Sequence, residues 1–284
     1  MKLRNKIIAA ALAAFCLFST GCSSSPSASG ASGIDPSVIG TTGDGNVNFQ
    51  LKAGDKIAEI TISGYGTIKA KLFPEVAPVG VENFIKLAEK GYYDGKNIHR
   101  VVADFMLQGG SLNGDGTGGE AAAGGDFSIE PNYNARHFYG ALCYANAMGR
   151  NTTQFYIVNA KSAELFTDED IEMISQNVDV CRAYRDSYDK NDTGYQYWDN
   201  MATYYNNLTS MIENATDDIN SKYESEGGTP SLDGGYTVFG QVYEGFDVID
   251  SVSACKVKTN SGGELSEPVD TITIESVKIT EYVG

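Results

Sequence analysis

The stretch that decides the fold is NIHRVVADFMLQGG, residues 97–110. If residues 97–102 are extended, side chains alternate between two faces, and Ile98, Arg100 and Val102 share one of them. A permanently charged arginine between two branched aliphatic residues is an unusual choice for one face of a strand. Two large apolar residues and an amide follow closely, namely Phe105, Met106 and Gln108. The stretch therefore raises the question of why an obligate cation stands there, followed so closely by these three residues.

The segments before this stretch predict a β-hairpin followed by one helix. Residues 56–73 hold two alternating runs around Gly64-Tyr65-Gly66, which is the pattern of a hairpin, and Pro74 and Pro78 end it. Apolar residues then recur at helical spacing before Gly91, a typical C-cap, and these are Val81, Phe84, Ile85 and Ala88.

The segments after it add strands and few helices. Beyond the glycine-rich residues 109–125, residues 138–147 and 153–160 are expected to be two strands. Three more strand candidates lie near the end of the chain, at residues 236–243, 254–259 and 271–283. A short helix is expected at residues 244–252. This composition of elements favours a mainly β fold, either a closed barrel or a sandwich.

One region, residues from about 161 to 230, breaks the pattern. It is acidic, rich in Tyr and Asn, and without strand alternation. Thr167 precedes a run of acids, as at a helix N-terminus. Further along, large side chains stand near helical spacing at Trp198, Met201, Tyr204, Leu208 and Met211. We expect a helical insertion of two or three helices, whose role is either surface decoration or the binding of a partner.

The N-terminus has the organisation of an export signal. Cations in the first six residues precede a short apolar run at residues 7–18. The ending Ser-Thr-Gly-Cys, residues 19–22, resembles a bacterial lipobox, although Ser19 stands where an aliphatic residue is usual. We expect a signal peptide over residues 1–21 and lipidation of Cys22; the alternative is ordinary cleavage nearby, with Cys22 incidental.

The residues that follow the signal predict a tether. Residues 22–48 are rich in Ser, Gly and Pro, a composition that cannot bury a core and is typical of a flexible linker. The folded domain is then residues 49–284, interrupted by the insertion. We expect it outside the cytoplasm, attached to a bacterial membrane through the lipid.

Charge argues against nucleic acid as a partner. The chain has 21 basic residues, and removal of the three in the signal leaves 18 against 37 acidic ones, a net charge of −19. Such a chain is repelled by phosphate backbones and by anionic lipid. We therefore expect no nucleic acid partner, and membrane attachment that depends on the lipid.

Neither cysteine nor histidine usage indicates a metal or a cofactor. Cys143, Cys181 and Cys255 are far apart and lack metal-ligand or CxxC spacing; a disulfide between two of them would leave one thiol over. His99 and His137 have no further ligands at suitable spacing and are expected to be structural. We expect no metal and no cofactor.

Taken in order, several blocks of the chain resemble the cyclophilins, the barrel-shaped peptidyl-prolyl cis/trans isomerases. The blocks are PEVAPVGVENFIKLAEKGYYDGKNIHRVVADFMLQGG (74–110), GALCYANAMGRNTTQFYIV (140–158), LDGGYTVFGQVYEGFDVID (232–250) and VKITE (277–281). The resemblance covers about residues 50–160 and 231–281, on both sides of the insertion. It implies a closed antiparallel eight-stranded barrel capped by two helices.

The resemblance also implies roles for individual side chains. The family's catalytic arginine falls on Arg100 and its supporting glutamine on Gln108. The positions that bind the peptide and the proline ring fall on Phe105, Met106, Ala145, Asn146, Gln154, Tyr156, Leu232 and Tyr236. The pocket departs from the family where Ser231 replaces an aromatic residue, Tyr156 a phenylalanine and Tyr236 a histidine. These changes predict a more polar, reshaped pocket wall.

The implied activity is isomerisation of the peptide bond before proline, without a covalent intermediate, in secreted or surface proteins. Its partners would be proline-containing polypeptides, and we expect a monomer. Two alternatives stay open on the sequence alone. One is a proline-peptide binding module that lacks turnover, and the other is a chaperone whose insertion recruits unfolded chains.

Overall fold

A computed structural model describes residues 50–284. The expected signal peptide (1–21), Cys22 and the linker (22–48) lie outside the described residues. Within residues 50–284, no helix has both the length and the apolar character that a membrane crossing requires.

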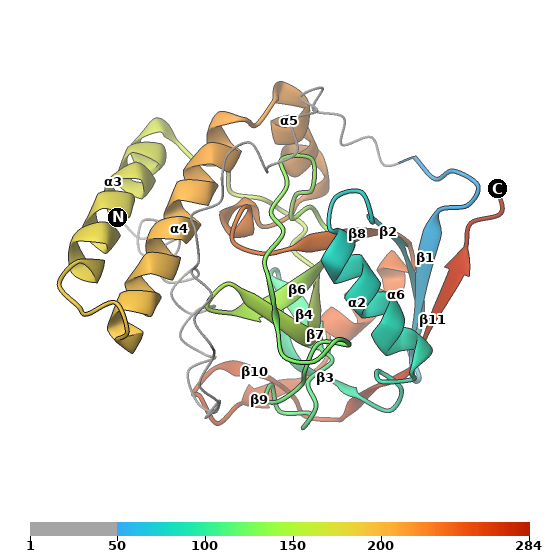
Figure 1. The fold of residues 1–284 in the computed structure, drawn as a ribbon. Helices are drawn as coiled ribbons and strands as arrows, with labels where there is room; N and C mark the ends of the chain where they lie inside the picture. Colours follow the sequence, from blue (N-terminus) through green and yellow to red (C-terminus); the bar gives the residue numbers. More distant parts are fainter. Residues whose placement is uncertain (1–49) are drawn as a thin grey trace.

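Eight antiparallel strands close into a barrel (Figure 1). Their order is β4-β3-β11-β1-β2-β8-β6-β7, and pairing of β4 with β7 closes the ring. The strands are β1 (Lys56–Ile62), β2 (Gly66–Leu72), β3 (Asn97–Val102), β4 (Met106–Gly109), β6 (Ala141–Ala147), β7 (Arg150–Val158), β8 (Val238–Glu244) and β11 (Ile272–Glu281), with the short β5 (Phe127–Ser128) beside the start of β7. The barrel expectation is confirmed, and the sandwich is wrong.

The predicted hairpin is β1 and β2. Ile60 lies opposite Ile68, and both side chains are fully buried in the barrel core. Gly64 occupies the turn with a φ of +77°, a conformation that glycine adopts without steric cost. Alternation in these two strands therefore directs one face of each into the barrel.

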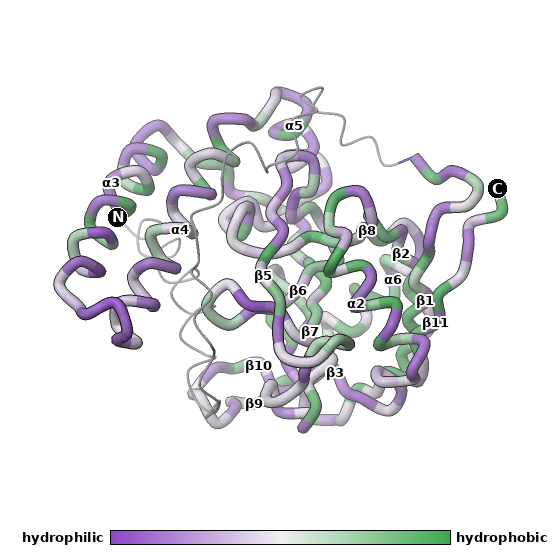
Figure 2. The backbone as a smooth tube through the Cα atoms, viewed as in Figure 1, coloured by the Kyte–Doolittle hydropathy of each residue, from purple (hydrophilic) through white to green (hydrophobic). Residues whose placement is uncertain are grey.

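Two helices cap the barrel, as expected. α2 (Pro78–Glu89) begins with proline in its first turn, and α6 (Phe246–Ser253) follows β8. Phe84 of α2 and Ile249 of α6 are both fully buried in the same apolar cluster as the barrel strands. Figure 2 shows hydrophobic residues, in green, concentrated in the barrel strands and these helices. One continuous core thus holds the barrel and its caps together.

The insertion consists of three helices between β7 and the 3₁₀ turn η1 (Pro230–Leu232). They are α3 (Asp168–Arg185), α4 (Thr193–Glu213) and α5 (Asp217–Glu226). Thr167 caps α3 as predicted, since its hydroxyl accepts a hydrogen bond from the Asp170 amide and the Asp170 carboxylate accepts one from the Thr167 amide. α3 and α4 lie side by side at the left of Figure 1 and share an apolar cluster of their own.

The strand expected at residues 254–259 does not belong to the barrel. Residues 254–256 follow the end of α6, and β9 (Val257–Thr259) pairs only with β10 (Leu265–Pro268) in a separate ribbon. This ribbon lies against β3. Its position matters because its loop reaches the candidate site.

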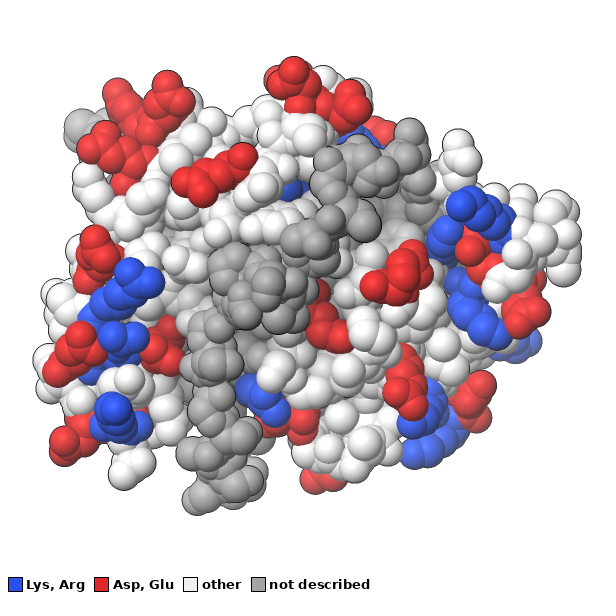
Figure 3. Space-filling view, turned by 45° about the horizontal axis from the view of Figure 1, so that its top comes forward, with Lys and Arg blue, Asp and Glu red and all other residues white. Residues whose placement is uncertain are grey.

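The acidic composition is visible on the surface. On the face in Figure 3, acidic side chains gather in groups along the upper edge, while basic side chains lie beside acidic ones. Among the described residues, the exposed ion pairs include Lys56–Glu281 and Arg150–Asp126, each with a nitrogen–oxygen distance of 2.6 Å. Exposed pairs of this kind contribute little to stability.

Candidate active site

A β-bulge in β3 determines where Arg100 points. In the pairing with β4, Ile98 lies opposite Gly109, whereas Arg100 lies opposite Gln108. Two steps along β3 therefore match one step along β4, and His99 is the extra residue. A bulge inserts one residue into a strand and re-aims the side chains that follow it.

The bulge corrects the expectation drawn from the sequence. Ile98 and Val101 are both buried in the barrel core, although regular alternation would place them on opposite faces. Arg100 and Val102 lie on the other face, where Val102 packs against a second apolar cluster. The expectation that Ile98 shares a face with Arg100 is wrong, because alternation reverses at His99.

Arg100 borders a small pocket whose lining comes from strands and from loops. Its lining side chains are Arg100, Phe105, Met106, Gln108, Ala145, Tyr156, Leu232 and Tyr236. The guanidinium carbon lies 5.8 Å from the centre of the Phe105 ring, and Nη1 lies 3.8 Å from the Met106 sulfur. The structure thus brings together all but two of the peptide-site residues predicted from the sequence.

The first of the two, Gln154, contacts Arg100 through another glutamine. Nη1 of Arg100 donates to Oε1 of Gln108 at 3.2 Å, and Nε2 of Gln108 donates to Oε1 of Gln154 at 3.0 Å. Nε2 of Gln154 in turn donates to the Gly116 carbonyl at 2.8 Å. Gln154 is therefore buried and supports Gln108, and its role in binding the peptide stays a prediction.

The second, Asn146, lies beside the pocket and is engaged within the protein. Its Nδ2 donates to the Gly235 carbonyl at 3.0 Å, and its Oδ1 accepts from the Gly149 amide at 3.1 Å. Asn146 thereby fixes the end of β6 to the loop that carries Leu232 and Tyr236.

Glu264, in the loop between β9 and β10, is a partner of Arg100 that the sequence did not reveal. Its two carboxylate oxygens accept from Nε and Nη2 of Arg100 at 2.6 and 2.7 Å. Such a two-pronged pair fixes the orientation of the guanidinium. The partners stand 164 positions apart, and no spacing pattern in the loop points to the pair.

The charge of Glu264 depends on this contact. Partial burial alone would raise the pKa of its carboxyl, but hydrogen bonds from Arg100 and Ser266 outweigh burial and hold the pKa below its ordinary value. Glu264 is therefore ionised at neutral pH. Ser266 is fully buried, and Asn260 donates to its hydroxyl at 3.2 Å, which steadies the loop.

This pKa shift predicts a pH-dependent stability difference between the wild type and Glu264→Gln. A carboxyl whose pKa is lowered by folding stabilises above its unfolded pKa, and this contribution disappears as pH falls through the folded pKa. The difference in melting temperature should be largest above about pH 5 and shrink below about pH 4. Glu267→Gln, on the exposed side of the ribbon, is the control. A Glu264→Gln difference that stays constant across this range would contradict the assignment.

The hydroxyl of Tyr156 is directed into the protein. It lies 2.9 Å from Nε2 of the fully buried His137, whose ring stacks on that of Tyr156 with a centroid distance of 6.1 Å. Burial raises the pKa of Tyr156 well above its ordinary value, so the hydroxyl keeps its proton. The expectation of a more polar wall is therefore wrong at Tyr156, which presents an aromatic surface to the pocket.

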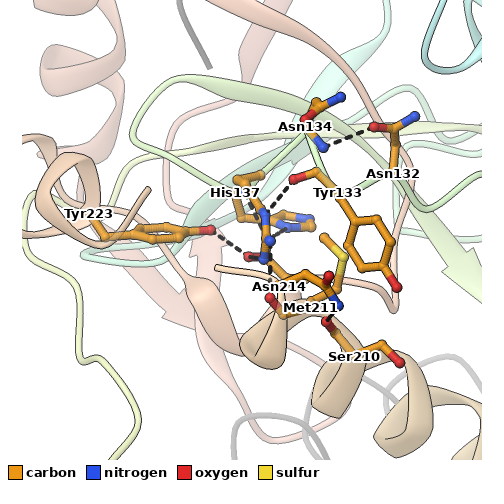
Figure 4. A network of polar contacts seen from close by, with 10 residues as sticks. Asn132, Tyr133, Asn134, His137, Ser210, Met211, Asn214 and Tyr223 are labelled. Carbon is orange, nitrogen blue, oxygen red and sulfur yellow. Dashed lines mark hydrogen bonds and ion pairs between the residues drawn. The ribbon is translucent and has the colours of Figure 1, made fainter. Parts of the chain in front are cut away.

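A buried network continues from His137 into the insertion (Figure 4). The Asp233 carboxylate accepts from His137 through its amide at 3.0 Å and Nδ1 at 2.8 Å, from Arg136 Nη1 at 3.1 Å and from the Tyr223 hydroxyl at 2.8 Å. Since a carboxylate only accepts, Nδ1 is the donor. Burial by itself raises the pKa of Asp233, but hydrogen bonds from His137 and the charge of Arg136 hold it below its ordinary value.

Tyr156→Phe restores the phenylalanine of the family that the sequence resembles, and it should leave the pocket surface intact. For the isomerase activity that the resemblance implies, we expect kcat/KM on a proline peptide within about twofold of the wild type, because the lost hydroxyl does not line the pocket. Stability should fall by about 1 kcal/mol, because His137 Nε2 loses its partner. Steady-state kinetics and denaturant unfolding check both parts, with the exposed Tyr188→Phe as control. A large loss of kcat/KM at unchanged stability would contradict this reading.

His99 and the three cysteines of the described residues do not line the pocket. His99 is buried beside Arg100, and burial together with that neighbouring charge lowers its pKa to about 4, so the ring is neutral at neutral pH. Cys143, Cys181 and Cys255 are free thiols. Among residues 50–284, no group of three or more His, Cys, Asp or Glu side chains is placed to hold a metal ion.

Comparison with known proteins identifies the class. Residues 57–177 and 199–279 match the family described as cyclophilin type peptidyl-prolyl cis-trans isomerase. The chain therefore belongs to the cyclophilin-type peptidyl-prolyl cis/trans isomerases. Its match to the family has one interruption, residues 178–198, which lies in the insertion.

Particular relatives agree with this membership. The chain is 34% identical over 237 residues to a putative peptidyl-prolyl cis-trans isomerase of Staphylococcus aureus, covering 83% of this chain and 97% of the relative. It is 35% identical over 218 residues to one of Staphylococcus haemolyticus, covering 76% and 87%. A crystal structure of a Cryptosporidium parvum cyclophilin, determined in the presence of the dipeptide Ala-Pro, shares the fold with a TM-score of 0.50 and 21% identity, covering 80% of this chain and 99% of the other.

Proposed function

We propose that this enzyme accelerates isomerisation of the bond before proline by stabilising a twisted amide with Arg100, and that its substrates are secreted or surface polypeptides. The observation that carries the proposal is the place of the Arg100 guanidinium, largely buried at the edge of a pocket lined mainly by apolar side chains. A ligand held in that pocket would have its reacting bond beside a fixed cation.

The chemistry follows from the electronic structure of the amide. Resonance between the nitrogen lone pair and the carbonyl produces a rotational barrier of about 18–20 kcal/mol. Rotation about the bond breaks this resonance and returns the lone pair to nitrogen. A cationic donor near that nitrogen stabilises the twisted state more than either planar state, which lowers the barrier without a covalent intermediate.

The residues around Arg100 have separate roles in the proposed mechanism. Phe105, Met106 and Leu232 supply apolar surface for the proline ring. Gln108 and Glu264 fix two sides of the guanidinium, so that little reorganisation is needed as the amide twists. A cyclophilin of the same fold has been crystallised in the presence of Ala-Pro, and this supports a proline-containing ligand here.

An NMR exchange experiment on a proline-containing peptide tests the proposal. Sub-stoichiometric amounts of the mature protein should produce exchange cross-peaks between cis and trans signals, on a time scale where the free peptide, with interconversion taking tens to hundreds of seconds, shows none. Chemical shift changes without exchange would indicate a binding module and contradict catalysis. A protease-coupled assay provides the independent rate.

The site of action is part of the same proposal. Residues 1–22 resemble a lipoprotein signal, which supports attachment through a lipid at Cys22 on the outer side of the cytoplasmic membrane. In cells of a bacterial host, Cys22→Ser should move the protein from the membrane fraction to the soluble one. Retention of the variant in the membrane fraction would contradict a lipid anchor.

A further inference from the structure

One wall of the pocket is a loop with little structure of its own. Residues 229–236 connect the insertion to β8, contain only the short turn η1, and carry Leu232 and Tyr236. Arg100, Phe105 and Met106, which also line the pocket, stand on β3, β4 and the turn between them. The width of the pocket therefore depends on what holds this loop.

Helix α4 of the insertion holds the loop from outside. The Tyr204 hydroxyl donates to the Ser231 carbonyl, and Nδ2 of Asn207 donates to the Gly234 carbonyl at 3.0 Å. Both side chains are at least nine-tenths buried. A Cβ atom on Gly235 would lie 2.4 Å from the Tyr204 ring, so glycine is what permits this close approach.

A second set of contacts ties the insertion to the buried network beneath the pocket. Tyr223 of α5 donates to Asp233, which lies between Leu232 and Tyr236 in the loop. Nη2 of Arg136 donates to the Met211 carbonyl of α4 at 3.0 Å. Figure 4 shows Tyr223 and Met211 entering this region from the insertion, with His137 between them. The insertion thus contacts the loop along its length.

We propose that the insertion sets the affinity of the proline pocket: Tyr204 and Asn207 are positioning residues that hold the Leu232–Tyr236 wall at its working distance from Arg100. This inference rests on the proposed proline-peptide site. The insertion does not contact the peptide in this account. It acts by fixing the wall, while Arg100 keeps its separate supports in Gln108 and Glu264.

The test compares adjacent residues of one helix. Tyr204→Phe and Asn207→Ala each remove a hydrogen bond to the loop. Tyr205→Phe and Asn206→Ala are matched controls, because within the described residues neither side chain is hydrogen-bonded to the loop, and Asn206 is exposed. The full mature chain is used, with a proline-containing peptide as the probe, and Kd by NMR titration, KM, kcat and melting temperature are measured.

We expect Kd and KM to rise about three- to tenfold in Tyr204→Phe and Asn207→Ala, the size of one lost hydrogen bond, with kcat changed less than twofold. The controls should match the wild type. A lower melting temperature with unchanged Kd and KM would overturn the proposal and leave the insertion a purely structural role. If Asn207→Ala does not fold, Tyr204→Phe decides, since it removes a single oxygen atom.

The design separates this inference from the proposed function. If the wild type binds the peptide without accelerating isomerisation, catalysis is refuted, and the Kd comparison still tests the role of the insertion. If the wild type does not bind the peptide, both proposals fail together. If it catalyses isomerisation and the variants equal their controls, only the positioning role fails.

Discussion

Replacing Arg100 with alanine should lower kcat/KM for a proline-containing peptide by about a hundred- to a thousandfold, or about 3–4 kcal/mol in the transition state. The pocket keeps its apolar side chains in this variant, so peptide binding should weaken far less than turnover. NMR titration and the protease-coupled assay measure the two effects separately. Arg182→Ala, an exposed arginine of α3, should behave as the wild type.

Two further variants isolate the reason for the loss. Arg100→Lys keeps the charge but not the planar fork that Glu264 and Gln108 hold, so its rate should remain well below that of the wild type. The double variant Arg100→Ala/Glu264→Gln removes the carboxylate that the single variant leaves without its partner, and it should stay equally slow. Full activity in Arg100→Ala would sink the proposed mechanism.

Asp233→Ala should lower the free energy of unfolding by about 3–5 kcal/mol, the cost of leaving a buried partner charge uncompensated. The ion pair is Asp233–Arg136, and each of its two side chains is 2% exposed. Asp233 also accepts hydrogen bonds from His137 and Tyr223. Denaturant unfolding measures the change. Asp126→Ala breaks the exposed pair with Arg150 and should cost at most about 1 kcal/mol.

The outcome of this comparison distinguishes a buried network from a surface contact. If Asp233→Ala loses no more stability than Asp126→Ala, the buried network does not have the expected energetic role. Arg136 would then have gained solvent or another partner in the variant through local rearrangement of the loop that carries residue 233. Because folding lowers the pKa of Asp233, its contribution should be present above its unfolded pKa and disappear as pH falls through the folded value.

Local patterns in the sequence predicted the individual helices and strands. They could not predict how strands far apart in the chain pair with one another. The β1–β2 hairpin and α2 follow from alternation and helical spacing within short segments. Closure of the ring by β4 and β7 joins residues about fifty positions apart, so strand patterns alone left barrel and sandwich open. Only the resemblance of long blocks to one family resolved that choice.

The same limit applies to the site. Arg100, Phe105, Met106 and Gln108 stand within one hairpin, and their proximity was predictable from their spacing. The engagement of Asn146 by Gly235 and of Tyr156 by His137 was not, because it depends on which buried polar groups find partners after folding. The sequence indicates a tyrosine at the pocket, and packing decides which way its hydroxyl points.

The bulge at His99 explains the arginine between two aliphatic residues. Ile98 follows the alternation of side chains before the bulge, and Val101 and Val102 follow the alternation after it. β3 thus consists of two regularly alternating segments joined at His99. This one short strand therefore contributes side chains both to the interior of the barrel and to its outer face. If the bulge were lost and His99 took a place in regular alternation, Arg100 would share the face of Ile98 and direct its guanidinium into the apolar interior, so the bulge is as essential to the chemistry as the identity of the arginine itself.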